Sequence, residues 1–371
     1  MDSCSITLFN FSTLKKVLVD LGKLKDLNSG LGQVSLNFGH ELSNAMRSTN
    51  LSLHFLVPRS FVDEFEEANI HYEKLSLIRR WFPALNKRYD LWHAIHQDSG
   101  YMPPSGIPYL LTIHDLNFMY EKSKEKAAKR LAVMQRKINR AEHVTFISHF
   151  AKEEALKFVD LKGKPTSVIY NGVKTPDKKN MIQPSWIPSG DFLFAIGVVR
   201  PKKNFLVLVE MMSKPELQEY SLVIAGNDDH AYAGDIMEAI AAHGLEDRVV
   251  LTGSISEREK NYFYHNCSAL LIPSLYEGFG LPVIEAMLCG KPVFSSRSTS
   301  LPEIGGDKSF YWDSFEPLHM AEVFAKGMEI FHKNPQAFQK ELKEYAARFT
   351  WKENATAYIA LYEQLTHSRK S

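Results

Sequence analysis

Two glutamates flank a glycine-rich turn in the segment SLYEGFGLPVIEAM, residues 274–287. Glu277 precedes the turn, and Glu285 lies one turn into a helix that Pro282 is suited to begin. Glycines let the backbone approach a ligand closely, and unpaired amides at a helix start bind anions. The residues expected to supply this anion site are Gly278, Phe279, Gly280 and Leu281. We expect the amides to hold a diphosphate while the two carboxylates accept hydrogen bonds from sugar hydroxyls, Glu285 from a ribose. The alternative is that Glu285 merely favours the helix dipole.

The chain as a whole has the composition of a globular protein. Its 371 residues exceed one ordinary core, which predicts two domains. The three cysteines match neither a zinc site nor a disulfide framework, which suits a reducing compartment. No apolar run reaches about 18 residues, and the start MDSCSITLFNFS carries no basic region typical of a secretory signal. We therefore expect a cytoplasmic protein.

Charge is divided unevenly along the chain. Residues 1–185 hold 26 Lys and Arg against 19 Asp and Glu, whereas residues 186–371 hold 18 against 24. A basic first half indicates an anionic partner, such as a membrane surface or a phosphorylated acceptor. The basic residues form no recognisable nucleic-acid reader, so we expect no nucleic-acid partner. Chance differences between two solvated surfaces explain the asymmetry equally well.

Short apolar runs alternate with amphipathic segments, the pattern of βαβ units and parallel sheets. The expected strands are 5–9, 51–57, 91–94, 109–113, 143–147 and 167–169, then 192–196, 221–225, 249–251, 269–272 and 292–295, with the clearest early helices at 34–47 and 124–140. The segment 173–190 is rich in Pro, Lys and Ser and predicts a linker. The fold class is α/β, with two Rossmann-like doubly wound domains facing a central cleft. We expect domains at 1–180 and 181–349, followed by a C-terminal helix in 350–371 that closes the second domain or crosses back to the first.

Residues that follow strands are the next candidates, because ligands bind beyond the carboxyl ends of parallel strands. Lys202 and Lys203 can neutralise charge that develops on a leaving diphosphate, although a lysine pair at a surface turn is often simply solvated. His114 follows the strand at 109–113, where a histidine more often has a structural role. Gly30 and Gly32 can bring backbone near a phosphate or a sugar, although such glycine pairs mostly form ordinary turns.

The string EGFGLPVIEAM resembles the signature of the retaining glycosyltransferases with two Rossmann-like domains, glycosyltransferase family four-like (group 1), which include many mannosyltransferases of polysaccharide assembly. Six further motifs occur in the order typical of this family and extend the resemblance over about residues 25–310. They are SGLGQV (29–34), TIHDL (112–116), FISHFAKEE (146–154), VIYNGV (168–173), IGVVRPKKN (196–204) and SLPEIGG (300–306).

The resemblance implies a reaction and roles for several residues. A hexosyl group would pass from a nucleotide-diphospho-sugar to an acceptor hydroxyl with retention of configuration, and the PRKN-like form of RPKKN favours GDP-mannose. Lys203 would stabilise the leaving diphosphate, His114 would lie against the transferred sugar, and Glu277 would complete the catalytic set. Many relatives carry an arginine where this chain has Gln33 or Val198. Arg200 is the candidate replacement for the second of these arginines.

No Asp-x-Asp motif precedes a candidate site, so the sequence predicts a metal-independent reaction without a cofactor. The acceptor is a saccharide or a lipid-linked molecule bound by the first domain. Two basic stretches, 74–92 and 121–143, can lie on an anionic membrane, or can be a core-facing loop and a solvated helix. The alternatives to a transferase are a sugar-nucleotide epimerase and a non-catalytic partner subunit that binds a nucleotide sugar.

Overall fold

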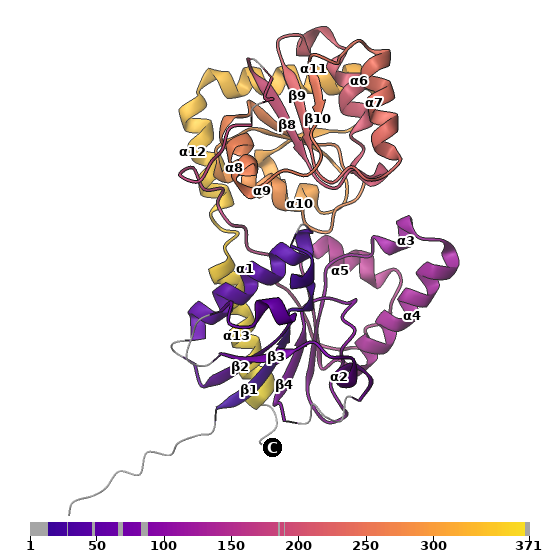
Figure 1. The fold of residues 1–371 in the computed structure, drawn as a ribbon, viewed down its shortest axis with the longest axis vertical. Helices are drawn as coiled ribbons and strands as arrows, with labels where there is room; N and C mark the ends of the chain where they lie inside the picture. The colour runs from indigo at the N-terminus through magenta and orange to yellow at the C-terminus, as the bar shows by residue number, and fades with distance from the viewer. Residues whose placement is uncertain are drawn as a thin grey trace, which may run out of the picture.

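Two parallel β-sheets organise the chain, one in each half (Figure 1). The computed structural model describes residues 14–27, 29–46, 49–65, 70–82, 88–184, 186–188 and 190–367. The predicted strand at 5–9 lies outside these residues. The predicted fold class, two α/β domains with parallel sheets, is confirmed.

The first sheet has the strand order β3-β2-β1-β4-β5-β6-β7, and every described pairing in it is parallel. Its strands are β1 (Lys15–Asp20), β2 (Leu51–Val57), β3 (Ile70–Lys74), β4 (Leu91–Ala94), β5 (Tyr109–Ile113), β6 (His143–Phe146) and β7 (Thr166–Val168). Val17 pairs with Leu53 of β2 on one side and with Leu91 of β4 on the other. The strand order therefore reverses beside β1, which opens a crevice at the carboxyl ends of β1 and β4.

The second sheet repeats this plan with the order β10-β9-β8-β11-β12-β13. Its strands are β8 (Phe192–Ile196), β9 (Ser221–Ala225), β10 (Val249–Leu251), β11 (Ala269–Ile272), β12 (Val293–Ser296) and β13 (Phe310–Trp312). The segment from β7 to β8 includes the predicted linker, and the boundary predicted after residue 180 stays a prediction.

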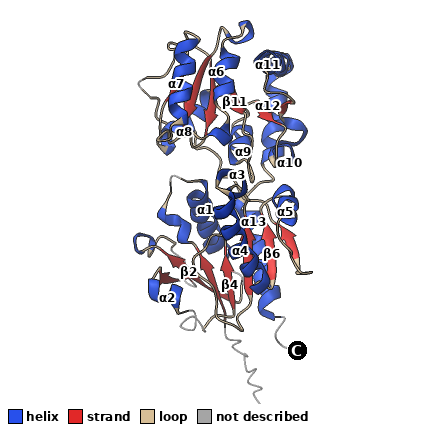
Figure 2. Cartoon of the chain, turned by 90° about the vertical axis from the view of Figure 1, so that its right-hand side faces the viewer, coloured by secondary structure: helices blue, strands red, loops and turns tan. Residues whose placement is uncertain are grey.

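Helices cover both faces of each sheet (Figure 2). They are α1 (Gly30–Ala45), α2 (Leu77–Trp81), α3 (Phe118–Glu121), α4 (Lys124–Arg140), α5 (His149–Leu156), α6 (Leu206–Met212), α7 (Tyr232–Ala242), α8 (Glu257–Asn266), α9 (Leu281–Leu288), α10 (Leu301–Gly305), α11 (Pro317–Lys333), α12 (Pro335–Ala346) and α13 (Trp351–His367). Short 3-10 turns are η1 (Gly22–Lys25), η3 (Arg59–Phe61), η5 (Pro201–Lys203), η6 (Pro215–Leu217) and η7 (Gly306–Lys308).

Alternation along each strand decides which helices it meets, because successive side chains point to opposite faces. Val17 and Val19 of β1 pack with α1 and α13, whereas Leu18 packs with α4 and α5 on the other face. In the second sheet, Leu193 faces α6, α7 and α11, whereas Phe194 faces α8, α9 and α12. Strands buried on both faces read as continuous apolar runs, which is why the sequence reveals them so clearly.

The C-terminal helix α13 runs back along the first domain and packs against α1 (Figure 1). Its aromatic residues enter the core of that domain, and the Tyr362 hydroxyl lies 2.7 Å from His93 Nδ1. The connection is tight, because a Cβ on Gly172 would lie 2.2 Å from the backbone nitrogen of Trp351. The last helix therefore ties the two domains together through buried contacts.

One interpretation of the sequence was wrong. No strand was predicted between the expected strand at 5–9 and the SGLGQV motif, but β1 occupies Lys15–Asp20 there. The loop therefore follows β1 closely, with only η1 between them. The helix predicted at 34–47 begins earlier, at Gly30, because the Ser29 hydroxyl accepts a hydrogen bond from the backbone N–H of Gly32 at 3.1 Å and caps it.

Candidate active site

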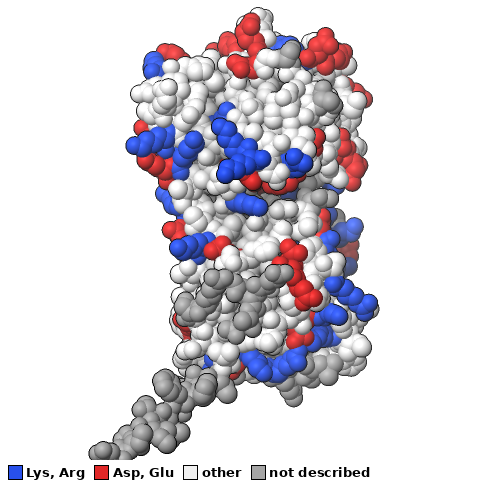
Figure 3. All heavy atoms as spheres, turned by 60° about the vertical axis from the view of Figure 1, so that its left-hand side comes forward, with Lys and Arg blue, Asp and Glu red and all other residues white. Residues whose placement is uncertain are grey.

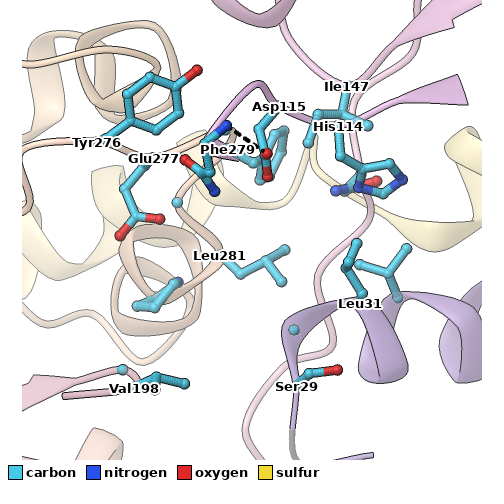
Figure 4. Close-up of a pocket in the computed structure, with 18 of the residues that line it drawn as sticks. Ser29, Leu31, His114, Asp115, Ile147, Val198, Tyr276, Glu277, Phe279 and Leu281 are labelled. Atoms are coloured by element: carbon cyan, nitrogen blue, oxygen red, sulfur yellow. Dashed lines mark hydrogen bonds between the residues drawn. The ribbon is translucent and has the colours of Figure 1, made fainter. Parts of the chain in front are cut away.

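A cleft of about 1480 Å³ lies between the two domains. Figure 4 shows Tyr276 and Glu277 on one side and His114, Leu31 and Ser29 on the other. The cleft brings together all twelve site residues that the sequence predicted: Gly30, Gly32, His114, Arg200, Lys202, Lys203, Glu277, Gly278, Phe279, Gly280, Leu281 and Glu285, of which only Gly32 does not line its wall directly. On the face shown in Figure 3, Lys and Arg side chains gather on the part of the second domain nearest the first.

The EGFGLP turn leads from β11 into α9 and has the predicted local structure. Gly280 caps α9 with a φ of 104°, a left-handed conformation that favours glycine, and Pro282 lies in the first turn. Gly278 lines the cleft and also meets the first domain. A Cβ at this position would lie 2.7 Å from the carbonyl oxygen of His114, so its small size allows the two domains to meet here.

Glu277 and Lys203 form an ion pair on the second-domain wall of the cleft. The Ser274 hydroxyl donates to the same Oε1 atom of Glu277 at 2.8 Å, and the Glu277 backbone N–H donates to Thr299 Oγ1 at 3.0 Å. The side chains of Lys203 and Glu277 are only 13% and 17% exposed. The carboxylate and the ammonium therefore hold each other in fixed positions, a pairing that their separation of 74 residues conceals in the sequence.

Glu285 on α9 is held by two residues of α8 that sequence reasoning did not identify. The Tyr264 hydroxyl donates to its Oε2 atom at 2.6 Å, and the Lys260 ammonium lies 3.3 Å from its Oε1 atom. Burial, together with the Glu285 charge, raises the pKa of Tyr264 well above its usual value, so the phenol stays a donor. Burial opposes the charge on Lys260, but the carboxylates of Glu285 and Glu257 outweigh it and raise the pKa of this ammonium.

His114 lies at the carboxyl end of β5, deep in the wall formed by the first domain. Its Nε2 atom is 2.7 Å from the carbonyl oxygen of Ile95, so Nε2 carries the proton and donates it. Burial lowers the pKa of His114 to about 4, which makes the ring neutral at pH 7 and leaves Nδ1 as an acceptor. The carboxylate of the neighbouring Asp115 accepts the backbone N–H of Asn117 at 3.0 Å, just before α3.

The remaining predicted residues have varied surroundings. Arg200 is half exposed and lies 3.4 Å from Asp229, whereas Lys202 reaches across the cleft to Glu121 of α3, with 2.7 Å between its ammonium and the carboxylate. Gly30 opens toward the cleft. Gly32 is required by packing, because a Cβ there would lie 1.9 Å from the Asp26 carbonyl oxygen.

A second contact between the domains involves Glu303 of α10, in the SLPEIGG motif. Its carboxylate accepts the backbone N–H groups of His149 and Phe150 at 2.7 and 2.9 Å, at the start of α5 in the first domain. Ser148, the cap of the same helix, donates its hydroxyl to the Gly278 carbonyl oxygen at 2.9 Å. The sequence placed these motifs in order but gave no sign that they meet.

The described residues hold neither a cluster of metal-binding side chains nor a helix suited to span a membrane. No group of three or more His, Cys, Asp or Glu side chains in this part of the chain is placed to hold a metal ion. None of the helices described for residues 30–367 combines the length and apolar character needed to cross a bilayer.

Two family models match the chain, one in each half. Residues 39–176 match "Glycosyltransferase Family 4", and residues 177–349 match "Glycosyl transferases group 1". Among individual proteins, the chain is similar to the serotype-specific mannosyltransferase WbdA of Escherichia coli, with 26% identity over 245 residues. That alignment covers 62% of this chain and 29% of WbdA, so the chain spans less than a third of that relative.

Two further mannosyltransferases align with different shares of the chain. The O-antigen chain mannosyltransferase B of Escherichia coli is 22% identical over 387 residues, which cover 94% of this chain and 100% of that protein. The O-antigen chain mannosyltransferase RfbU of Salmonella typhimurium is 30% identical over 203 residues, covering 54% and 55%.

Solved structures share the fold at low sequence identity. Sucrose-phosphate synthase from Thermosynechococcus elongatus has a TM-score of 0.73 at 19% identity, with coverage of 95% of this chain and 100% of that one. Anabaena HepE in complex with UDP and glucose has a TM-score of 0.72 at 18% identity, with coverage of 94% and 100%.

Proposed function

The chain belongs to the group 1, family four-like glycosyltransferases with two Rossmann-like domains, and from this premise we propose what it transfers and how. We propose that it moves a hexosyl group from a nucleotide-diphospho-sugar to a hydroxyl of a saccharide or lipid-linked acceptor in polysaccharide biosynthesis. The observation that carries this proposal is the Lys203–Glu277 pair beside the start of α9, facing His114 across the cleft.

The charges of the cleft support a diphosphate site. The Lys203 ammonium and the amides at the start of α9 both favour negative charge, and both lie on the same wall. Departure of a nucleoside diphosphate concentrates negative charge on its outer phosphate. A fixed ammonium and fixed amides stabilise that charge without reorganising during the reaction, which is the electrostatic contribution that usually dominates.

Glu285 is suited to bind the ribose. Its two oxygens are already oriented by Tyr264 and Lys260, and a carboxylate fixed in this way can accept hydrogen bonds from two neighbouring hydroxyls. Glu277 would meet hydroxyls of the transferred sugar, and the neutral His114 would accept a hydrogen bond from that sugar through Nδ1.

We propose a retaining reaction, as the family resemblance implies. The bond between the sugar C1 and the phosphate oxygen breaks, and its electron pair leaves on the diphosphate. The acceptor oxygen forms a new bond to C1 on the same face, and its proton passes to an oxygen of the leaving diphosphate. The Lys203 ammonium and the α9 amides can stabilise the leaving group in place of a metal ion, so we propose a metal-independent step.

GDP-mannose is the proposed donor. The mannosyltransferase names of WbdA, mannosyltransferase B and RfbU support mannose, together with the RPKKN sequence. A lipid-linked acceptor would bring the protein to the inner face of a membrane. Of the two basic stretches, α4 directs Met134 and Ile138 into the core of the first domain and so has no free apolar face there. The stretch at 74–92 keeps exposed apolar residues.

Nucleotide release from purified full-length protein tests the proposal. GDP-, UDP-, ADP- and dTDP-sugars are supplied with EDTA, and the released nucleoside diphosphate is measured. We expect slow hydrolysis and thermal protection with GDP-mannose. The variant Glu285→Gln should weaken donor binding, whereas the surface control Glu329→Gln on α11 should not. Binding without release would indicate a partner subunit, an isomerised sugar would indicate an epimerase, and loss of activity in EDTA restored by a divalent ion would refute metal independence.

A further inference from the structure

Helix α2 and the residue after it display an unusual amount of apolar surface. Leu77, Ile78, Trp81 and Phe82 are 69%, 63%, 72% and 62% exposed. Among the other large apolar side chains of the described residues, only Met237, at 62%, and Tyr120, at 59%, are exposed to a similar degree. Single exposed apolar residues are ordinary, but four within six positions mark an interaction surface. We call these four residues the α2 knuckle.

An ordinary surface helix turns its apolar side inward and its charged side outward, whereas α2 does the reverse. Arg79 points inward and pairs with the buried carboxylate of Glu73. Arg88 pairs with the same carboxylate. The Tyr89 hydroxyl donates to Glu73 at 2.8 Å and completes the cluster. Polar contacts therefore anchor the base of α2, while its apolar residues face outward.

Two hydrogen bonds fix the start of α2 as well. The Ser76 hydroxyl accepts the backbone N–H of Arg79 at 3.3 Å, and the Ser76 backbone N–H donates to the Tyr101 hydroxyl at 3.1 Å. The outward orientation of the knuckle is thus built into the fold. Figures 1 and 2 show α2 on the first domain, away from the second, so this surface is separate from the walls of the second domain.

We propose that the α2 knuckle inserts into the surface of an anionic membrane. Exposed cations, Lys74 and Arg80, border the apolar residues and would meet anionic headgroups. Tryptophan and phenylalanine suit the boundary between headgroups and acyl chains, and long basic side chains can lie along apolar surface with their charge in water.

A protein partner fits these observations less well. A stable protein interface buries roughly 800 Å² on each partner, over some 20 to 30 residues. The knuckle is a short protruding element of six positions, and a bilayer needs only such a local insertion. The choice of a membrane also rests on the proposed function, because a lipid-linked acceptor resides there. Vesicle binding itself needs neither donor nor acceptor.

The experiment uses the full-length protein and vesicles of phosphatidylethanolamine with phosphatidylglycerol, compared with pure phosphatidylcholine. We expect sedimentation with the anionic vesicles at low salt and weaker binding as salt rises. The double variant Trp81→Ser/Phe82→Ser should lower the partition coefficient on the order of tenfold. The matched control Met237→Ser, equally exposed but on α7 of the second domain, should bind as the unchanged protein does.

Tryptophan fluorescence gives a second, site-specific readout. Trp81 emission should shift to shorter wavelength when anionic vesicles are added, and Trp81→Phe should lose this shift while keeping vesicle binding. For charge, Arg80→Gln should weaken binding and Lys129→Gln, an exposed lysine on α4, should not. Circular dichroism confirms that each variant is folded.

Three results would overturn the proposal: absence of binding to anionic vesicles, equal losses in Trp81→Ser/Phe82→Ser and Met237→Ser, or a dimer that the double variant dissociates without any vesicle binding. The last would identify a protein interface. Donor hydrolysis is measured in parallel on all variants. Failure of hydrolysis with intact vesicle binding would count against the proposed function alone, and the converse against the membrane surface alone.

Discussion

Replacing Lys203 with methionine should lower both the stability of the protein and its rate of transfer, and a second substitution at Glu277 should restore only part of the stability. The substitution keeps most of the aliphatic stem that passes over Gly197 but leaves the Glu277 carboxylate without its cation. Breaking a buried ion pair costs about 3–5 kcal/mol. Glu277 keeps the Ser274 hydroxyl and lines the cleft with 17% of its side chain exposed, so we place the loss lower, at about 2–3 kcal/mol.

Removing the negative charge as well should restore part of this stability. In Lys203→Met/Glu277→Gln no charge remains unpaired, and we expect about 1–2 kcal/mol to return. Activity should behave differently. Lys203→Met should lower kcat/KM by about 10²- to 10³-fold, as loss of one preorganised group that stabilises a transition state does, and the double variant should recover none of it.

We measure urea unfolding and initial rates of nucleotide release on the two single variants and the double variant. These data give one double-mutant cycle for stability and one for activity. The exposed pair Lys333–Glu329 on α11 is the control, where Lys333→Met should cost no more than about 0.5 kcal/mol. A coupling free energy near zero between Lys203 and Glu277 would refute the pairing. Recovery of activity in the double variant would refute the role assigned to the Lys203 charge.

Three further predictions test the site and its support. Burial holds the His114 pKa at about 4, below its usual 6.5, so the unfolded chain binds the proton more readily. The contribution of His114 to stability should therefore be constant above pH 6.5 and fall by about 3 kcal/mol between pH 6.5 and 4, and urea unfolding across pH should show a loss smaller by about this amount in His114→Gln than in the unchanged protein. Glu303→Ala should loosen the contact between the domains, which should raise KM more than it lowers kcat and enlarge the radius of gyration in X-ray scattering. The control Glu153→Ala, at an exposed position of α5, should change neither the kinetics nor the radius of gyration. Gly280→Ala should destabilise the protein by about 1–3 kcal/mol because φ is 104°, whereas Gly234→Ala, exposed in α7 with open space at its Cβ, should stabilise it by up to about 1 kcal/mol in thermal unfolding.

The buried strands were the most predictable part of the fold. The predicted bounds of β2, β4, β5, β8, β9, β10 and β11 agree with the structure to the residue. All of these except the edge strand β10 lie inside a sheet with helices on both faces, so they are buried and largely apolar, although polar residues such as His54 of β2 and His93 of β4 interrupt them. The strands that were missed lack this signal. β3 (IHYEK) is an edge strand with polar residues, β13 (FYW) is an edge strand of only three, and β1 (KKVLVD) offers an apolar run of three between charged residues.

The site was predictable as a set of residues but not as a set of contacts. Motif order places Glu277, Lys203 and His114 after strands, and parallel strands deliver such residues to one edge. The identity of each partner depends on side chains that carry no sequence signature. Tyr264 and Lys260 read as ordinary residues of an amphipathic helix, yet they orient Glu285 because α8 packs beside α9.

The lysines of the cleft differ in what a bound diphosphate would disturb. Lys203 pairs with Glu277 and Lys260 with Glu285, and all four residues belong to the second domain. Lys202 instead pairs with Glu121 of the first domain. A diphosphate that competes for Lys203 therefore exchanges partners within one domain, whereas one that reaches Lys202 also removes a contact between domains. Because Glu303 and Ser148 provide separate contacts across the same boundary, the domains can stay together while Lys202 changes partner. Donor binding and domain contact are thus linked through Lys202, and Lys202→Met should weaken that link without removing the charge that Lys203 supplies.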